Sequence, residues 1–536
     1  MEDGSSQPVS ATTGCLSPNG GGLSLIFTTL CIIDLFGVFP VMTLPRPIIE
    51  CGWLGLPIAL SVFGLQIYTA VLLGRCWVIA ENIDPNIIRK SRYPYSALVE
   101  MSFGGAMSKF VTFLLDIAVF GGGVPNLLVA SQNLQLLGLM LSASSVNISY
   151  CYWLIILGII LCPIMWLGSP KDMKWVAVIS VGSVFGVALL TWANMMTDPN
   201  PPAVVHIPKP SWESFAIAYG ILAFQFDIHP MVLTVQVDMR NKADLGKAIV
   251  WSFIVTGGLF LVSTSIAMIK YGTAIRYNML QTFPANGLLY LDLLLVTVQI
   301  CLSMVVGGSA LFQDIEDRLG VPREFNWKRC ASRSSLLFFM VVIGEFVPRF
   351  DLIMGLIGGA LTGPLMFVFP PLLYIRYRYL QAQNQTKSPQ SALIDEIILS
   401  RDNTSAENNP YYKIYYDETE SVSHDDEYNE HSEFDGEFDS MEFSGHYCST
   451  PMVRNYGSIE IRHAGRGNII ARRLLNLIKK YLLSIQGPTD KYPITKFESF
   501  LIMCIIVLGM LATCGATFYS VRGAILYAKF TPACFP

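Results

Sequence analysis

The chain has 536 residues, a length that corresponds to roughly three or four soluble domains. Its composition excludes that organisation, because 52% of the residues are hydrophobic, only 14% are charged and the mean hydropathy is +0.47. The formal net charge of −4 hides an uneven distribution, since fourteen carboxylates and a single lysine lie between Asp402 and Glu442. This stretch carries about −13, and the remaining apolar body therefore carries about +9.

Residues 1–22 are polar and lack the basic start of a signal peptide, which predicts a disordered N-terminal segment. The body that follows contains continuous apolar runs close to the ~20 residues that a helix needs to cross a bilayer. Such runs predict helices rather than strands, because lipid tolerates only backbone whose polar groups are bonded internally. Eleven runs occur, at Leu23–Thr43, Trp53–Val78, Phe110–Leu141, Trp153–Gly168, Trp175–Trp192, Phe215–Val235, Ala248–Met268, Leu288–Phe312, Leu336–Val347, Leu352–Tyr374 and Phe500–Tyr519. We therefore expect an all-α polytopic membrane protein with about eleven transmembrane helices.

The basic residues predict the orientation of these helices. With the N-terminus in the cytosol, fifteen Lys and Arg residues lie in inner loops and five in outer loops up to the tenth span. Because Lys and Arg concentrate on the cytosolic side, the C-terminus is expected to be extracellular or lumenal. The sequon at Asn147 then lies in an outer loop and predicts a glycan. Cys151 can pair on this face with Cys51 or Cys534.

The first and sixth predicted spans differ from the others because helix breakers interrupt both at similar depth. The interrupting residues are Asp34, Gly37 and Pro40 in the first span and Asp227, His229 and Pro230 in the sixth. Proline removes a hydrogen-bond donor and clashes with the preceding turn, so each helix should break near mid-membrane. Five spans per half is an odd number, so the second half must enter the membrane inverted. Single kinks are common in membrane helices, but paired breaks in inverted halves favour a secondary-transporter site.

Broken helices of this kind suit a zwitterion. Half-helix N-termini offer unpaired N–H groups to a carboxylate, and half-helix C-termini offer carbonyls to an ammonium group or a cation. Asp34 and Asp227 are expected to contact the ammonium or a cation, because an inert carboxylate at the bilayer centre costs about 2.5–3.5 kcal/mol. His229 is either a hydrogen-bonded structural group or a coupling residue that carries a proton. Asp116 and Asp292, nearer the ends of their spans, are interpreted as snorkelling to an interface.

Three segments resemble the amino acid/auxin permease family, which includes the vesicular inhibitory and proton-coupled amino acid transporters. The stretch from Phe224 to Met239 is similar to its sixth-helix pattern F-x-F-x-G-H-P-x3-T-x-Q-x-D/E-M. Leu44–Gly55 resembles its L-P-x6-G-W-L-G, and Tyr93–Gly104 resembles its inner-loop Y-P…F-G. The resemblance implies a LeuT-like fold, with a 5+5 inverted repeat plus an eleventh helix, and transport of amino acids coupled to H+ or Na+.

Together the breaks and the resemblance predict a substrate site at Asp34, Gly37, Val38, Phe39, Phe224, Phe226 and Asp227. Coupling is assigned to Asp227 and His229. The sequence departs from the family at the first break, where Val38, Phe39 and Pro40 stand in place of G-S-G or a close variant. Ile228 also replaces the usual glycine before His229.

The transporter core is expected to span residues 23–379, and residues 380–496 form a cytosolic insert between spans ten and eleven. The acidic part has too few aliphatic residues for a core and is expected to be disordered, as a solvated tail or a docking segment for kinases. Tyr456 and Ile459 fit a Y-x-x-Φ sorting signal for adaptors. Residues 468–485 have one apolar face and basic residues mostly elsewhere, which predicts an amphipathic helix on the inner leaflet or on the protein. Residues 497–536 supply span eleven and a short outer C-terminus.

The sequence therefore favours secondary active transport of small neutral amino acids. The alternative from another class is an amino acid sensor of the same fold that signals through the insert without transporting. An enzyme is not expected, because the chain shows no nucleophile triad, metal-ligand spacing or phosphate-binding loop. No metal or cofactor is expected besides the coupling ion, and the expected partners are the amino acid and the bilayer, without nucleic acid. The location is the plasma membrane or a vesicular or endolysosomal membrane.

Overall fold

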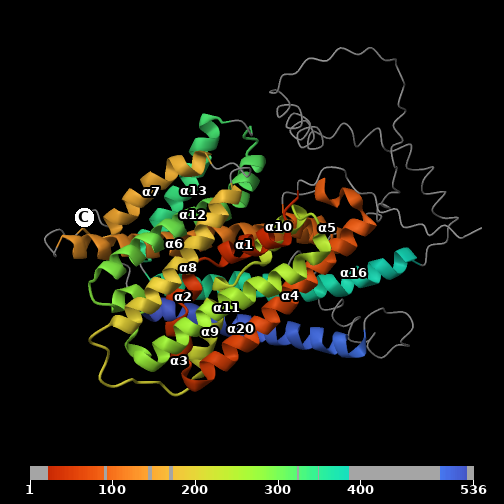
Figure 1. Cartoon of the computed structure of the whole chain (residues 1–536). Coiled ribbons are helices and arrows are strands. Elements are labelled where there is room, and N and C mark those ends of the chain that lie inside the picture. Colours follow the sequence, from red (N-terminus) through yellow and green to blue (C-terminus); the bar gives the residue numbers. More distant parts are fainter. Residues whose placement is uncertain are drawn as a thin grey trace, which may run out of the picture.

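A computed structural model describes residues 22–89, 93–142, 148–167, 173–322, 325–347, 349–385 and 495–527. Over these residues the chain is a bundle of helices, and its only strand-like contact is an isolated bridge between Leu23 and Met239 (Figure 1). The all-α prediction is confirmed. The acidic stretch, the 468–485 helix, the sorting residues Tyr456 and Ile459 and the sequon residue Asn147 lie outside the described residues.

Each of the eleven predicted runs falls on one or more helices. These are α1–α2–α3 (Leu25–Phe36, Phe39–Met42, Pro45–Glu50), α4 (Gly55–Ile83), α6 (Gly105–Leu141), α7 (Tyr150–Leu167), α8 (Met173–Thr197), α9–α10 (Trp212–Gln225, His229–Val237), α11 (Leu245–Lys270), α12 (Gly287–Arg318), α13 (Trp327–Phe346), α14 to α16 (Phe350–Ile357, Gly363–Phe367, Phe369–Gln385) and α20 (Lys496–Tyr527). A further helix, α5 (Pro94–Phe103), links α4 to α6. Eight helical segments among the described residues are long and apolar enough to cross a membrane. The protein is thus a multi-pass membrane protein, and the number of eleven crossings stays a prediction.

Both predicted interruptions are present. Helix α1 ends at Phe36 because Gly37 has φ +61°, and the chain re-enters a helix at Phe39 with Pro40 in its first turn. Helix α9 ends at Gln225, and α10 starts at His229 with a proline in its first turn. Proline is tolerated there because the first N–H groups of a helix have no intrahelical partner. The glycine and proline residues at these positions therefore determine where the two spans break.

The tenth span has an irregularity that the sequence analysis did not predict. A π-helical segment, η7 (Gly358–Thr362), separates α14 from α15 and packs against α9. A Cβ atom on Gly358 would lie 1.8 Å from the carbonyl oxygen of Gly220, so only glycine permits this approach. Insertion of a π segment places Thr362 beside the break between α9 and α10.

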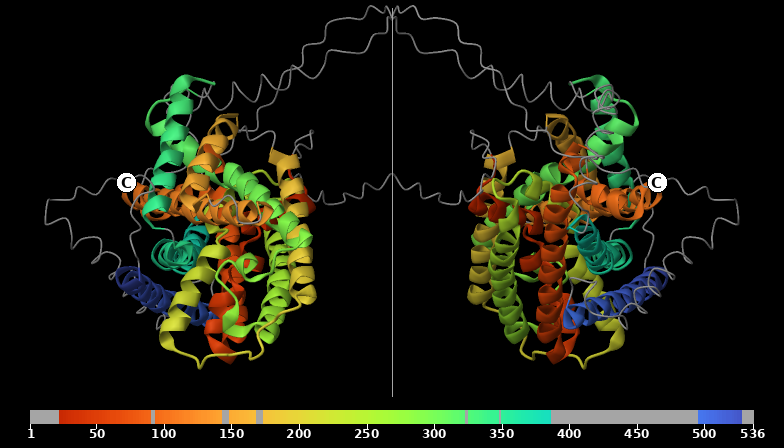
Figure 2. Two further views of the ribbon diagram at one scale, coloured as in Figure 1. Left: turned by 90° about the vertical axis from the view of Figure 1, so that its left-hand side faces the viewer. Right: turned by 90° about the vertical axis from the view of Figure 1, so that its right-hand side faces the viewer.

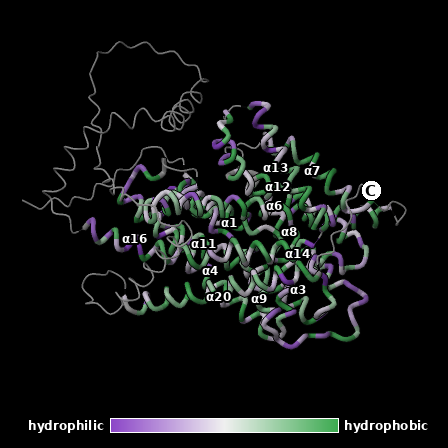
Figure 3. The backbone as a smooth tube through the Cα atoms, turned by 180° about the vertical axis from the view of Figure 1, so that it is seen from behind, coloured by the Kyte–Doolittle hydropathy of each residue, from purple (hydrophilic) through white to green (hydrophobic). Residues whose placement is uncertain are grey.

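The broken helices lie in the interior of the bundle. Helix α1 packs along α11 and α8, α12 packs along α6 and α8, and α16 packs along α4. Helix α20 lies at the periphery of the bundle, where it contacts α9, α14 and α15 (Figure 2). Hydrophobic residues follow the helix bodies, whereas hydrophilic residues gather toward loops and helix ends such as that of α16 (Figure 3).

The interpretation of Asp116 and Asp292 as snorkelling residues is wrong, because both are buried at helix contacts. Asp292 on α12 is fully buried, and the Thr191 hydroxyl donates to it at 2.9 Å and the Asn194 amide at 3.4 Å. Asp116 on α6 is 8% exposed and accepts hydrogen bonds from Tyr93 and from Arg318 of α12. Buried carboxylates require such partners, so position near a span end did not determine their environment.

The cysteines resolve one of the two pairings left open on the outer face. Cys151 is disulfide-bonded, whereas Cys51 is a free thiol whose sulfur lies 3.4 Å from the carbonyl oxygens of Pro47 and Ser214. Pairing between Cys151 and Cys51 is therefore excluded.

Candidate functional site

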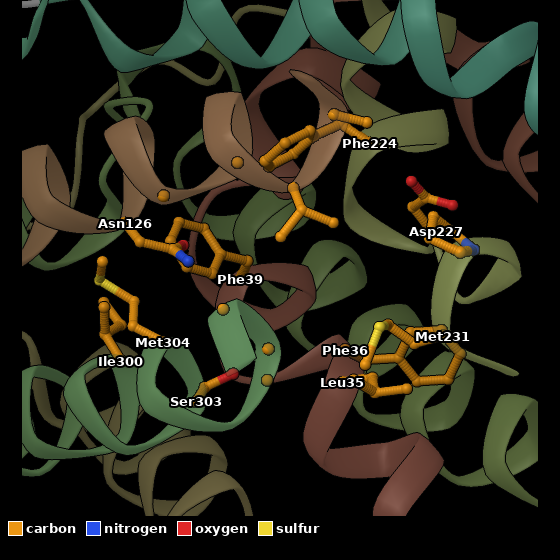
Figure 4. Close-up of a pocket in the computed structure, with 18 of the residues that line it drawn as sticks. Leu35, Phe36, Phe39, Asn126, Phe224, Asp227, Met231, Ile300, Ser303 and Met304 are labelled. Atoms are coloured by element: carbon orange, nitrogen blue, oxygen red, sulfur yellow. The ribbon is translucent and has the colours of Figure 1, made fainter. Parts of the chain in front are cut away.

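The two breaks face a shared cavity of about 170 Å³ in the middle of the bundle (Figure 4). Its walls come from the first break, α6, the second break, α12 and α13. A single water needs only ~10–15 Å³ of such volume, so the cavity holds a small molecule rather than one solvent molecule. Apolar walls surround a few polar groups, namely Asn126, Gln225, Asp227, Gln299 and Ser303. This is the usual composition of a small-ligand site.

The first break exposes backbone donors. The described backbone bonds include no acceptor for the amides of Val38 and Phe39, whereas Val41 and Met42 both donate to the Val38 carbonyl. A Cβ atom on Gly37 would lie 3.1 Å from Nε2 of Gln299, so the glycine permits close approach of α12. This end of the site can therefore hold a carboxylate through main-chain N–H groups.

Asp34 lies behind the first break rather than in the cavity. It is 2% exposed, and its carboxyl interacts with the Ser180 hydroxyl of α8. Ser180 in turn accepts a hydrogen bond from Gln299 Nε2 at 3.2 Å, so a polar chain joins α1, α8 and α12. Oδ1 of Asp34 has no hydrogen-bond partner, and Oε1 of Gln299 has none either. This row of polar side chains therefore leaves two acceptor oxygens unsatisfied, and one of them, Oε1 of Gln299, lies close to Gly37.

The second break places Asp227 in the cavity wall. Asp227 is among the labelled lining residues (Figure 4). Its carboxyl lies near the Thr362 hydroxyl of η7 and the N–H of His229, but Oδ1 of Asp227 and Oγ1 of Thr362 have no hydrogen-bond partner. Nearby, Gln225 donates through Nε2 to the hydroxyl of Thr43, which itself donates to the Phe39 carbonyl. Because this bond uses Nε2, it sets the orientation of the Gln225 amide, and Oε1 has no hydrogen-bond partner.

His229 is fully buried and does not line the cavity. Its Nε2 lies 3.1 Å from the hydroxyl of Thr69 on α4. In the tautomer with a proton on Nε2, His229 donates to this hydroxyl oxygen, and the hydroxyl donates to a carbonyl of its own helix, at Leu65 or Gln66. The ring therefore joins α10 to α4, and Nδ1 remains without a partner.

Phe226 points away from the cavity and is not part of its wall. Its ring packs within an aromatic cluster formed with Phe36, Phe63, Phe253 and Phe260, at centroid distances from 4.2 to 6.4 Å. The residue is fully buried. The cluster fixes the break of α9 against α4 and α11, so Phe226 contributes packing rather than substrate contact.

Four of the predicted substrate residues line the cavity, namely Gly37, Phe39, Phe224 and Asp227. Val38 offers its backbone amide, and Asp34 and Phe226 lie behind the wall. Sequence reasoning missed Asn126, Gln299 and Ser303, which face the cavity from α6 and α12. Two signals were available, since amide side chains are rare within apolar runs and glycine pairs, Gly122–Gly123 and Gly307–Gly308, mark the same walls.

The unpaired groups of the site are mainly acceptors. Gln225 Oε1, Asp227 Oδ1 and Gln299 Oε1 line or adjoin the cavity without hydrogen-bond donors. An unsatisfied buried acceptor costs about 1–3 kcal/mol, and an ammonium group or a cation would satisfy several at once. With main-chain donors at the first break, the arrangement suits a small zwitterion.

Residues 25–399 match the family described as transmembrane amino acid transporter protein. The chain belongs to this family. It is 22% identical over 347 residues to "Amino acid transporter AVT1E" of Arabidopsis thaliana, an alignment that covers 62% of this chain and 63% of the relative. "Amino acid transporter AVT1D" is 23% identical, with 62% and 60% covered, and "Amino acid permease 2" is 20% identical, with 64% and 78% covered, both from Arabidopsis thaliana.

The chain thus spans about three fifths of the length of the first two of these relatives. Among solved structures, one titled "Crystal structure of MhsT in complex with L-phenylalanine" aligns at a TM-score of 0.41 and 13% identity. That alignment covers 69% of this chain and 91% of the other.

Proposed function

We propose that the protein is a secondary active transporter of small neutral amino acids. The observation that carries the proposal is the cavity between two broken helices, with free main-chain amides on one side and unpaired acceptors on the other. Family membership supports amino acid transport. The rings of Phe39 and Phe224 and the side chains of Met231 and Met304 narrow the cavity, which favours a substrate with a small side chain (Figure 4).

Coupling to H+ or Na+ is assigned to buried carboxyl groups. Asp227 and Asp34 each have an oxygen without a donor, so each either carries a proton or receives a cation. Asp34 reaches the cavity through Ser180 and Gln299, which gives a cation bound there a route to bias the first break. His229 shares the second break with Asp227, but its hydrogen bond to Thr69 favours a structural role.

We assign the end of the bundle where α4 finishes and α11 begins to the cytosol. Arg75, Lys242 and Lys247 lie at this end, whereas the disulfide-bonded Cys151 begins the helix after the sequon loop at the other end. Disulfides persist in extracellular and lumenal compartments, which supports an outer location for that loop. The plasma membrane and a vesicular or endolysosomal membrane both satisfy this orientation.

The test is uptake of a panel of radiolabelled amino acids into liposomes that contain the full chain. Either an inward pH gradient or an Na+ gradient should drive accumulation of small neutral amino acids, and collapse of the gradient should abolish it. Failure of every standard amino acid under both gradients would contradict the proposal. Sidedness is measured separately, by protease access to tags at the two termini.

A sensor without transport is the second candidate. One observation favours it, because the Phe39 ring lines the cavity at the position where the family has small residues (Figure 4). In that case amino acids should bind and raise the thermal unfolding midpoint of the protein, while the liposomes show no flux. Binding with gradient-driven flux would rule the sensor out.

A further inference from the structure

A second and larger cavity, of about 810 Å³, lies between α4, α11 and α16, away from the substrate cavity. Four basic residues surround it: Arg75, Lys242, Lys247 and Arg378. Neighbouring carboxylates neutralise only part of this charge. Lys242 pairs with Glu81, and Lys247 pairs with Asp244 at 2.7 Å. Among the described residues Arg75 forms no ion pair, and a further carboxylate is that of Glu498 on α20, which acts on the cavity residue Tyr374 together with Arg75.

The cavity continues from this basic end into an apolar groove. Trp251 and Ile254 of α11 line it and are 57% and 55% exposed. Ile254 lies seven residues beyond Lys247, which is ~10 Å along the helix axis. Helix α11 belongs to a segment long and apolar enough to cross a membrane, so these exposed side chains face lipid. A basic head region that leads to an apolar groove matches the shape of a phospholipid.

A buried amide in the wall of the cavity indicates which polar groups a ligand should carry. Gln236 is 1% exposed and donates through Nε2 to the carbonyls of Gly74 at 3.0 Å and Lys242 at 2.9 Å. Since both neighbours are acceptors, the amide orientation is fixed, and Oε1 is left without a partner. The site therefore requires a hydrogen-bond donor as well as an anion.

We propose that this groove binds an anionic phospholipid whose headgroup also carries a hydrogen-bond donor. Phosphate would contact Arg75 and Lys247, a headgroup hydroxyl or ammonium would donate to Gln236, and the acyl chains would lie along Trp251 and Ile254. The acidic stretch of the chain between residues 402 and 442 fits less well, because it carries fourteen carboxylates and few aliphatic side chains to fill the apolar part of the groove at Trp251 and Ile254. Under the proposed orientation the lipid belongs to the inner leaflet, where anionic lipids are concentrated.

The experiment uses the full chain in nanodiscs of phosphatidylcholine, with or without phosphatidylinositol. Native mass spectrometry after release into detergent measures the retained phosphatidylinositol. We expect retention by the unmodified chain and about tenfold weaker retention by Arg75→Gln, which corresponds to ~1.4 kcal/mol. Lys109→Gln, an exposed basic residue on the first turn of α6 outside the groove, is the matched control and should retain lipid normally.

A second variant blocks the groove without changing charge. A Cβ on Gly246 would meet only Val71, at 3.7 Å, so Gly246→Leu fits the helix and fills the lipid path. Its retention of phosphatidylinositol should also fall. Normal retention by both variants would overturn the proposal, as would equal retention of phosphatidic acid, which has no headgroup substituent. Retention that appears only after deletion of residues 402–442 would assign the groove to that segment and equally overturn it.

Discussion

At the residue scale, the proposed substrate site depends on a glycine whose backbone conformation other residues rarely adopt. Gly37 has φ +61° and ψ −153°, a region that is essentially restricted to glycine. Its conformation ends α1 and turns the amides of Val38 and Phe39 out of the helix ladder. Its lack of a side chain also admits Gln299.

We expect Gly37→Ala to reduce uptake strongly and to destabilise the protein by about 1–2 kcal/mol, because alanine adopts this backbone only with strain. Uptake in liposomes and thermal unfolding in detergent measure the two effects. Gly258→Ala on α11 is the control, because a Cβ there meets no atom within 4 Å. Normal uptake by Gly37→Ala would show that the first break does not shape the site.

Neutralising Asp227 tests its contact with the ammonium group or a cation. Asp227→Asn keeps the shape of the side chain but removes a charged acceptor, whose hydrogen bond is worth about 1.5–3 kcal/mol. We predict a roughly 10- to 100-fold rise in the half-saturating concentration, measured by initial rates of uptake. Glu213→Gln, an exposed carboxylate in the first turn of α9, the helix that precedes the break, should leave uptake unchanged. If both variants behave alike, Asp227 has no role in binding or coupling.

At the scale of elements, the second break is attached to its neighbours on two sides. The Phe226 ring anchors the end of α9 in the aromatic cluster, and His229 anchors the start of α10 to α4. The π segment η7 supplies a third contact, because it packs along α9 with Thr362 near the Asp227 carboxyl. These contacts hold an irregular backbone in one arrangement, which positions Asp227.

Thr69→Val separates the structural role of His229 from a coupling role. Valine has a similar shape but no acceptor, so a buried Nε2–H of His229 would lose its partner. The unsatisfied donor should lower the free energy of unfolding by about 1–3 kcal/mol. We expect a lower unfolding midpoint and an unchanged pH profile of uptake. Ser61→Ala, an exposed hydroxyl on the same helix, controls for loss of a bond to the helix's own carbonyl. A shifted pH optimum in Thr69→Val would instead assign proton coupling to His229.

At the scale of the whole molecule, hydrogen bonds and ion pairs join distant segments of the chain on both sides of the central cavity. On one side, the backbone of Leu23 is hydrogen-bonded to the backbone of Asp238 and Arg240, which joins the start of the first broken span to the end of the second. On the other side, Arg46 pairs with Glu50 at 2.7 Å and donates to the Ile275 carbonyl at 2.9 Å. Tyr277 donates to Glu50, and burial together with the nearby carboxylates raises its pKa, so the phenol stays protonated at neutral pH.

The free energy that an ion pair contributes indicates whether it can break when helices move. Partly exposed ion pairs such as Arg46–Glu50 contribute about 0–1 kcal/mol and can break during the proposed transport cycle. Arg333 on α13 is different, because it is 2% exposed and makes a bidentate pair with Glu316 of α12 at 2.6 and 3.2 Å. It also donates to the Met165 carbonyl of α7. We infer that α7, α12 and α13 move together at this point.

Removing one partner of this pair should destabilise the fold. Glu316→Gln leaves a buried guanidinium without its counter-charge, and breaking a buried pair costs about 3–5 kcal/mol. Thermal unfolding should show a large loss of stability, and the double variant Arg333→Met, Glu316→Leu should recover most of it. A full transport cycle in the double variant would confirm that the pair is structural, whereas a stable Glu316→Gln protein would contradict the buried pairing.

Much of the fold followed from the sequence because lipid imposes simple rules. Continuous apolar runs identified the helices, and Gly37, Pro40 and Pro230 identified the breaks. Proline lacks the N–H that a helix needs, and a residue with positive φ cannot continue a right-handed helix. Motifs around Phe224–Met239 indicated the family. These signals are local, and each can be read within one span.

Side-chain direction was not available from the sequence. Phe226 lies between the cavity residues Gln225 and Asp227 in the sequence, yet it faces an aromatic cluster. Asp292, near a span end, is fully buried. Asn126 and Gln299 reach the central cavity from spans that have no break. Sequence alone determined the membrane helices, their two interruptions and the split between a basic body and an acidic insert. The tertiary structure alone decided which polar groups meet, because that depends on how distant helices rotate and pack against one another.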